Sequence, residues 1–318
     1  MEKNELCRLF PEKIRTMIDK LPIRADEVRE IRFRIQNPIF LYLDGKEVMM
    51  DKNGQVCKEI NESYKPTKED LEEILSYISE FSIYAFEEEI KQGFLTLRGG
   101  HRVGIVGKPV IENGKIKTFQ YIIGLNFRIS HEIKGVASEL IRHLYGSNGV
   151  RNTLIISPPG FGKTTMLRDI IRMISDGTTY GEGQTVGVVD ERSEIGGSYL
   201  GIPQNDLGSR TDLLDACPKA EGMILLVRSM SPKVIAVDEL GGEDDIKAVD
   251  HILRSGCKII ATIHGENVEE LSHNRRLKGI LEENIFERYI ILRSPQSGKK
   301  NYAIYNSKMD LLGGSSKW

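Results

Sequence analysis

The sequence is poor in the residues that build disulfide scaffolds or structural metal sites. It contains only four cysteines in 318 residues, and no two of them have the Cys-x-x-Cys spacing of a metal or redox site. We therefore expect neither a disulfide nor a cysteine-bound metal, and we interpret the cysteines as free thiols. They are Cys7, Cys57, Cys217 and Cys257.

Long hydrophobic runs are also missing. No apolar run approaches the roughly 18 residues that cross a bilayer, and the first residues do not resemble a signal peptide. The longest runs, such as Met223 to Val227, have the length of a buried strand or a helix segment. We expect a cytoplasmic protein without direct membrane insertion.

The sequence has no excess of one sign of charge. Its 44 Lys and Arg residues against 46 Asp and Glu residues give a formal net charge of −2. This balance disfavours non-specific binding to nucleic acid. The hydrophobic share of 40% and the length are ordinary for a globular protein with two domains.

The first 130 residues predict a smaller α+β domain. Leu6 to Ile18 have the apolar spacing of one short amphipathic helix, whereas Val28 to Ile35 alternate as a strand does. Thr67 and Asp70 form a capping pair at the start of a second helix, and another helix is expected near Ile83 to Ile90. Two dipeptides predict hairpin turns, namely Asp44-Gly45 and Asn113-Gly114.

Residues 131–318 predict an α/β domain with a largely parallel sheet, because strand and helix patterns alternate there. We expect the domain boundary near residue 131 and a connecting helix from Gly135 to Leu144. Glu243, Asp244 and Asp245 suit the first turn of a helix. The candidate strands are 153–157, 185–190, 233–238, 258–263, 287–292 and 301–305.

Ser157 to Thr165 read Ser-Pro-Pro-Gly-Phe-Gly-Lys-Thr-Thr and lie between a predicted strand and a predicted helix. This is the context of a phosphate-binding loop, whose backbone N–H groups bind a triphosphate. Lys163 would reach the β- and γ-phosphates, and Thr164 would bind Mg²⁺. Ser157 replaces the first glycine of the pattern, which is tolerable only where no positive φ is needed. The expected ATP-binding residues are Pro158, Pro159, Gly160, Phe161, Gly162, Lys163, Thr164 and Thr165.

A second strand end supplies carboxylates. Val234 to Val237 are apolar and are followed by Asp238 and Glu239, at the strand end where open α/β sheets bind ligands. We predict that Asp238 holds Mg²⁺ and that Glu239 orients or deprotonates the attacking water.

Two further predicted strands end in polar residues at the same edge. One ends in Asp190 and Glu191, where Glu191 would polarise water or hold its own loop, and another ends in His264. His264 is either a γ-phosphate sensor or a structural histidine. Arginines that would stabilise the transferred phosphoryl group cannot be ranked from the sequence; the candidates are Arg98, Arg102, Arg128, Arg210 and Arg228.

Several short segments, from about Gly93 almost to the end, occur in a fixed order around these residues. They are Gly99–Gly104, Leu125–Ile129, Leu167–Asp169, Val189–Ile195, Cys217–Met223, Arg228–Pro232 and Ala261–Gly265. With the phosphate loop and Asp238-Glu239, they resemble the stage III sporulation protein AA family of endospore-forming bacteria, which is related to the type II and type IV secretion ATPases.

This resemblance implies a RecA-like P-loop ATPase domain that uses ATP and Mg²⁺ and works as a hexamer. It places Glu191 in an acidic box, Asp238 and Glu239 in the Walker B box and His264 in a histidine box, and it makes Arg102 and Arg128 similar to arginines that close over the nucleotide. The family is expected to power or assemble the channel between mother cell and forespore. It would act with inner-membrane channel proteins, at the mother-cell face of the membrane around the forespore.

Two alternatives remain open on the sequence. One is a nucleic-acid-dependent RecA-like motor, which the near-neutral charge disfavours. The other is a nucleotide-dependent scaffold with negligible hydrolysis, which the presence of Glu239 beside Asp238 disfavours.

Overall fold

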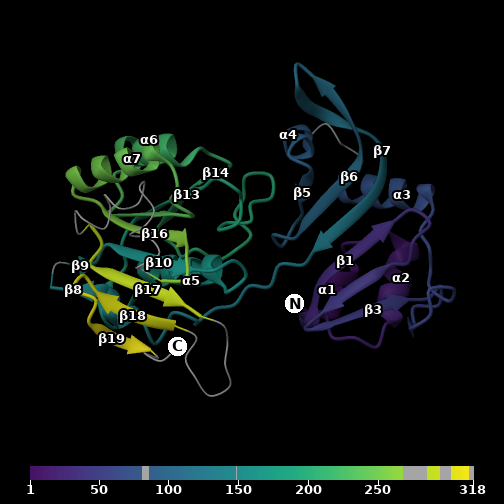
Figure 1. Ribbon diagram of the computed structural model, residues 1–318, viewed down its shortest axis with the longest axis horizontal. Helices are drawn as coiled ribbons and strands as arrows, with labels where there is room; N and C mark the ends of the chain where they lie inside the picture. Colours follow the sequence, from purple (N-terminus) through teal and green to yellow (C-terminus); the bar gives the residue numbers. More distant parts are fainter. Residues whose placement is uncertain (81–85, 148, 268–284, 294–301, 315–318) are drawn as a thin grey trace. The chain divides into compact units, whose positions relative to one another are not determined.

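A computed structural model describes residues 1–80, 86–147, 149–267, 285–293 and 302–314. The chain divides into two compact units, Met1–His131 and Glu132–Trp318 (Figure 1). Each unit has its own sheet and its own buried side chains. Among the described residues, no helix has both the length and the apolar character needed to cross a membrane.

Unit 1 is built on a seven-stranded sheet in the order β4-β3-β2-β1-β7-β6-β5, in which all described pairs are antiparallel. The strands are β1 (Val28–Arg34), β2 (Phe40–Leu43), β3 (Lys46–Met50), β4 (Val56–Cys57), β5 (Phe94–Thr96), β6 (Arg102–Glu112) and β7 (Lys115–Arg128). Both predicted Asx-Gly hairpin turns are confirmed, because Leu43 pairs with Lys46 and Glu112 pairs with Lys115.

The core of unit 1 lies between one face of this sheet and the helices. Phe10 packs against Phe33 of β1 and Phe127 of β7, with ring centroids 5.7 and 4.5 Å apart. The single helix predicted from Leu6 to Ile18 is wrong, because Pro11 separates two helices. The α-helices are α1 (Lys3–Cys7), α2 (Glu12–Lys20), α3 (Lys68–Ile78) and α4 (Glu87–Lys91), and Ala25–Glu27 form a 3₁₀ turn.

Helix α3 begins at the predicted capping pair, since the Thr67 hydroxyl accepts from the Asp70 N–H and the Asp70 carboxylate accepts from the Thr67 N–H. The start of the helix predicted near Ile83 lies outside the described residues. Strands β6 and β7 form one long hairpin, whose far end extends past the rest of the unit 1 sheet in Figure 1.

Unit 2 is built on an eight-stranded sheet in the order β14-β13-β15-β16-β10-β17-β18-β19. The first six strands in this order are parallel, and β18 and β19 are antiparallel. They are β10 (Thr153–Ser157), β13 (Val186–Asp190), β14 (Thr211–Asp215), β15 (Val234–Val237), β16 (Lys258–His264), β17 (Arg288–Leu292), β18 (Tyr302–Asn306) and β19 (Leu311–Gly314). Two short hairpins pair β8 (Tyr145–Gly146) with β9 (Gly149–Val150) and β11 (Gly177–Thr178) with β12 (Gly181–Glu182).

Helices cover both faces of this sheet, and alternate strand residues reach them. Ile155 of β10 belongs to the cluster around α5 (Lys163–Asp176) on one face. Its neighbours Leu154 and Ile156 belong to the cluster around α6 (Lys219–Met230) and α7 (Glu243–Arg254) on the other face. Figure 1 shows α6 and α7 side by side. Successive residues of β10 are therefore apolar from Leu154 to Ile156, as a doubly covered parallel sheet requires.

Two expectations for this unit are corrected. The helix predicted from Gly135 to Leu144 is wrong, because only Ile141–Leu144 form a short 3₁₀ helix. Asp169 accepts the Ala137 N–H at 2.8 Å, and the segment around it is closed by turns instead of a continuous helix. Strand β14 was not predicted, since its residues are only partly buried at the sheet edge.

Candidate functional site

The phosphate-loop residues connect β10 to α5, as the sequence predicts. Gly160 and Gly162 have φ values of 81° and 85°, and nothing lies within 4 Å of a Cβ built on either residue. Both glycines are therefore needed for backbone conformation, and the loop between them faces open space. Ser157 instead ends β10 in strand conformation and is fully buried. The first position of the pattern thus needs no glycine here.

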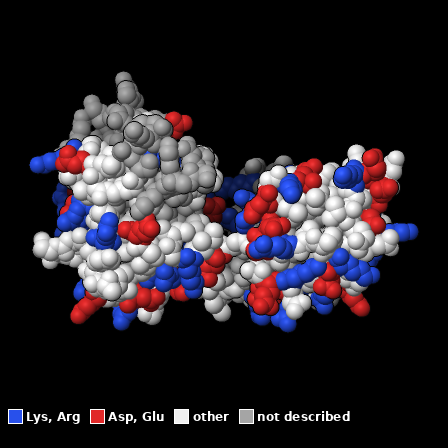
Figure 2. Space-filling model, turned by 90° about the horizontal axis from the view of Figure 1, so that it is seen from below, with Lys and Arg blue, Asp and Glu red and all other residues white. Residues whose placement is uncertain are grey.

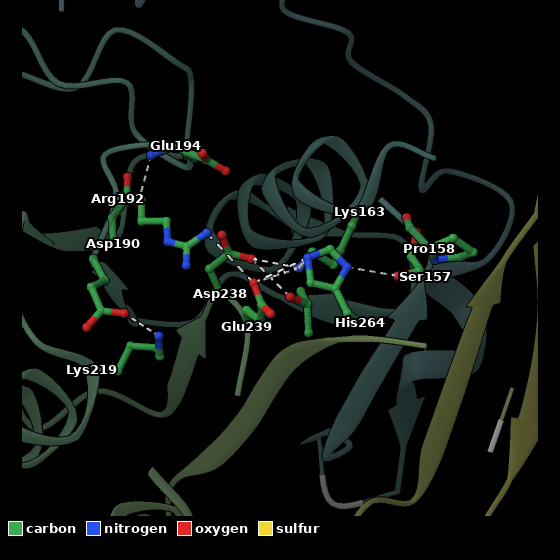
Figure 3. A network of polar contacts seen from close by, with 12 residues as sticks. Ser157, Pro158, Lys163, Asp190, Arg192, Glu194, Lys219, Asp238, Glu239 and His264 are labelled. Carbon is green, nitrogen blue, oxygen red and sulfur yellow. Dashed lines mark hydrogen bonds and ion pairs between the residues drawn. The ribbon is translucent and has the colours of Figure 1, made fainter. Parts of the chain in front are cut away.

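Lys163, the first residue of α5, is surrounded by the predicted strand-end residues (Figure 3). Its Nζ lies 3.7 Å from Asp238 Oδ1, 3.8 Å from Glu239 Oε2 and 3.4 Å from His264 Nε2. The Lys163 side chain is only 9% exposed, so these interactions act in a partly desolvated environment. We call Lys163, Asp238, Glu239 and His264 the strand-end cluster.

The strands fix the geometry of the strand-end cluster. Asp238 follows β15 directly, and its Oδ1 accepts from the Thr262 hydroxyl of β16 at 3.0 Å. His264 ends β16 opposite Ser157 of β10, and its Nδ1 lies 3.3 Å from the Ser157 carbonyl oxygen. Its Nε2 lies 3.3 Å from Glu239 Oε2. Because neighbouring parallel strands end at one edge of the sheet, residues far apart in sequence converge there.

Asp190, at the end of β13, is buried beside this edge and binds the loop that follows it. Its carboxylate accepts the N–H groups of Glu194, Ile195 and Gly196 at 2.8 to 2.9 Å. Burial raises the pKa of Asp190 to about 6, and these hydrogen bonds oppose the rise. Asp190 therefore shapes the loop that follows it.

Glu191, predicted to act on water or to hold its loop, pairs with Lys219 of α6 and not with Lys163. Arg192, the next residue, points back toward the strand-end cluster, with Nη1 4.0 Å from Glu239 Oε2 (Figure 3). Sequence reasoning missed both Lys219 and Arg192 as partners of the acidic residues. Arg192 directly follows an acidic strand end, and this position is the sequence signal that could have identified it.

Arg168 is a second residue that sequence reasoning missed. It lies on α5, is buried, and donates to the carbonyl oxygens of Ile195 at 2.9 Å and Glu194 at 2.8 Å. Burial lowers its pKa from the ordinary arginine value. The helix that follows the phosphate loop is thus tied to the loop formed around Asp190.

The arginine candidates lie in different places. Arg102 and Arg128 face each other across β6 and β7 in unit 1; Arg102 stacks over Phe94 and Arg128 Nε lies 4.0 Å from Glu30. Arg210 does not join the strand-end cluster of its own chain. It precedes β14, at the opposite end of the parallel strands, where its guanidinium donates to the Ser175 carbonyl.

Arg210 there lines an open cavity of about 440 Å³ together with residues of α5 and of the β11–β12 hairpin. Arg210 therefore lies away from the strand-end cluster of its own chain, and its role as an arginine that stabilises the phosphoryl group stays a prediction.

The residues present fit ATP and Mg²⁺. The open backbone between Gly160 and Gly162 and the start of α5 form a cradle for phosphate oxygens. The Asp238 carboxylate and the Thr164 hydroxyl are oxygen ligands of the kind that Mg²⁺ takes together with water and substrate phosphate. Lys163 supplies the positive charge for the β- and γ-phosphates.

The fold resembles that of two solved ATPase structures. The X-ray structure of the Legionella pneumophila ATPase DotB matches with a TM-score of 0.57 and 15% identity, over 88% of this chain and 77% of that chain. The pilus retraction motor PilT with bound ADP matches with a TM-score of 0.56 and 13% identity, over 91% and 80%. The chain has the mixed α/β, RecA-like fold of secretion and pilus ATPases, which confirms the predicted fold class.

The sequence comparisons give the family. The profile described as "Sporulation stage III, protein AA" matches residues 1–312. Stage III sporulation protein AA of Bacillus subtilis (strain 168) is 40% identical over 310 residues, which is 97% of either chain. This chain belongs to the stage III sporulation protein AA family, so the resemblance predicted from its motifs is confirmed.

Proposed function

We propose that this chain is an ATP-hydrolysing motor of the secretion type. The observation that carries the proposal is the strand-end cluster, in which Lys163 meets Asp238 and Glu239 at the end of a glycine-containing phosphate loop. A lysine for the phosphates, an aspartate for Mg²⁺ and a glutamate for the attacking water are the parts that P-loop hydrolysis needs. When bound, Mg²⁺ would neutralise charge on the β- and γ-phosphates.

Family membership extends the proposal to the process. The motor would work as a hexamer during endospore formation and would power or assemble the channel between mother cell and forespore. Inner-membrane proteins of that channel would hold it at the mother-cell face of the membrane. The resemblance of the fold to DotB and PilT supports a motor of this kind.

The test is steady-state ATP hydrolysis by the Glu239→Gln variant of the full chain. Glutamine keeps the size of the side chain but cannot accept a proton from water, so we expect kcat to fall by about 100-fold or more. Binding of a fluorescent ATP analogue should stay within a few-fold of the parent, because Lys163 and the loop are unchanged.

Glu243→Gln is the matched control. Glu243 is an exposed carboxylate in the first turn of α7, close in sequence to Glu239 but outside the strand-end cluster. Its turnover should equal that of the parent. A Glu239→Gln variant with the same slow turnover as the parent would overturn the motor and support a scaffold that binds nucleotide.

The remaining alternative is a motor driven by nucleic acid. On the face drawn in Figure 2, Lys and Arg are interspersed with Asp and Glu instead of gathered into one basic surface, which disfavours a nucleic-acid track. Adding single- or double-stranded DNA should therefore leave turnover unchanged. A many-fold stimulation by either DNA would establish this alternative in place of a secretion-type motor.

A further inference from the structure

The far end of the β6–β7 hairpin, residues 106–123, carries several exposed large apolar side chains. None of its residues is buried, and Ile111 and Tyr121 are 65% and 62% exposed. Strand β5 pairs with β6 only up to Gly104, and β1 pairs with β7 only from Gly124. Beyond these points β6 and β7 pair with each other among the described residues, apart from the Ile123 carbonyl oxygen, which accepts the Ile35 N–H at 3.1 Å. From Val110 to Lys117, around the turn, every residue is exposed.

The pairing register sorts the side chains of this hairpin end into two faces. Residues directly opposite each other in an antiparallel pair point to the same side, and every second residue shares that side. Ile111 pairs with Ile116, and Pro109 pairs with Phe119. On β7 the residues Ile116, Phe119 and Ile122 are three positions apart, and the register shifts beside Ile111 and beside Gly107 keep each of them opposite its β6 partner. We call Ile111, Ile116, Pro109, Phe119 and Ile122 the apolar hairpin face. The pairs Lys108–Gln120, Val110–Thr118 and Glu112–Lys115 alternate with them.

The open edges of this hairpin are poorly suited to adding another strand. The register shifts at three places between Val106 and Ile111, and Pro109 has no N–H to donate. Bulges, proline and lysine at a sheet edge are the usual means by which proteins prevent edge-to-edge pairing. The apolar hairpin face is therefore available to a partner through its side chains and not through backbone ladder bonds.

The charge of the hairpin end selects an anionic partner. Residues 106–123 carry Lys108, Lys115 and Lys117 against Glu112, a net charge of +2, in a chain whose formal net charge is −2. Glu112 is itself paired with Lys117 at 3.1 Å. A second copy of the same hairpin would bring like charges together, which disfavours self-association through this face.

We propose that the end of the β6–β7 hairpin docks on an anionic lipid surface. Glu112 and Lys115 flank the Asn113-Gly114 turn, and the exposed apolar pair Ile111–Ile116 is the next pair from the tip, with Lys115 and Lys117 on either side of Ile116 in sequence. Such a tip places apolar side chains at the headgroup–acyl boundary while the ammonium groups contact lipid phosphates. Exposed apolar side chains beside lysines suit a lipid surface, because binding there scales with buried apolar area and with attraction to anionic headgroups.

Flotation of the full chain with lipid vesicles tests the proposal. Phosphatidylcholine vesicles with about 30% phosphatidylglycerol should bind the parent, whereas pure phosphatidylcholine vesicles should not. Ile111→Ser with Ile116→Ser should weaken binding at least 10-fold, because two apolar anchors are lost. Lys115→Gln with Lys117→Gln should weaken it by roughly 30-fold at low salt, as two surface lysines contribute about 1 kcal/mol each.

Ile202→Ser and Lys247→Gln are the matched controls, because both residues are well exposed in unit 2. Neither should change vesicle binding, and all variants should keep the parental thermal midpoint, since no buried side chain is altered. Equal binding of neutral and anionic vesicles overturns the proposal, as does full retention of binding by the two double variants. Absence of vesicle binding by the parent also overturns it, and an acidic protein surface would then be the candidate partner of the hairpin.

Discussion

At the scale of single residues, His101 links stability to pH. It lies at the start of β6, is almost fully buried, and its Nδ1 accepts the Ser130 N–H at 3.0 Å. Burial lowers the pKa of His101 to about 4. A protonated Nδ1 would face the Ser130 N–H as a second donor, which adds to the cost of charging the ring.

We predict that acid weakens unit 1 through this histidine. Between pH 6.5 and about 4 the unfolded chain binds a proton at His101 that the native chain does not, so stability falls as pH falls. The difference between the ordinary pKa of 6.5 and the lowered pKa of about 4 corresponds to about 3 kcal/mol at the acid end. In urea unfolding at a series of pH values, His101→Gln should remove this part of the slope, because glutamine accepts the same N–H without titrating.

The comparison with the parent must be made as a difference at each pH, since other groups titrate in both proteins. A difference between the two unfolding free energies that stays constant from pH 7 to pH 4.5 would contradict the assignment.

The residues of the strand-end cluster were predictable from the sequence, and their immediate partners were not. Asp238 and His264 follow apolar strands, and parallel strands end at one edge, so their convergence follows from the pattern. Lys219 reaches Glu191 from a helix, and Arg192 reaches Glu239 from a loop. No sequence spacing predicts either contact, because both contacts depend on how α6 and the loop after β13 pack on the sheet.

At the scale of elements, the strand conformation of Ser157 explains why the phosphate loop tolerates serine at the first glycine position of the pattern. Ser157 lies in β10 and its hydroxyl donates to the Pro158 carbonyl at 2.8 Å. We predict that Ser157→Gly destabilises unit 2 by about 1 kcal/mol, because glycine loosens a strand end and loses this hydrogen bond. Nucleotide affinity, measured by calorimetry, should change less than two-fold.

Gly162→Ala provides the contrast in the same loop. Gly162 has a φ of 85°, so alanine there strains the backbone that precedes Lys163 and should weaken nucleotide binding strongly. A large gain in affinity for Ser157→Gly would show instead that the first pattern position does need glycine.

Elements with a strong local signal were the predictable ones. The strand–loop–helix unit of β10 and α5 has apolar periodicity on both sides of two glycines. Strand β14 has no such signal, since an edge strand alternates weakly. The segment from Gly135 to Leu144 was wrongly predicted as a helix because its buried residues have helical spacing. The Ala137 N–H instead donates to Asp169, outside the segment.

At the scale of the whole molecule, the proposed motor is a ring. We predict that light scattering of the parent in solution gives a mass near six times that of the 35.9 kDa chain when a non-hydrolysable ATP analogue and Mg²⁺ are present. Nucleotide binding would order the surfaces that meet between subunits. Lys163→Ala should reduce this nucleotide-dependent mass change, because the phosphates lose their lysine.

A steady monomer at high protein concentration, both with and without the analogue, would argue against an autonomous hexamer. Ring formation by Lys163→Ala to the same extent as the parent would show that assembly does not depend on the phosphate loop.

The sheet order of unit 2 also bears on how the chain is made. Strand β10 is an early strand of its sheet in sequence, yet its neighbours β16 and β17 follow it by roughly 100 residues or more. During synthesis, β10 can therefore pair with both neighbours only after β17 has left the ribosome. By then all residues of unit 1 have been made. Strand β10, central in the unit 2 sheet, is thus among the last strands to complete its pairing, and chains that stop before Arg288 should be held by chaperones or degraded.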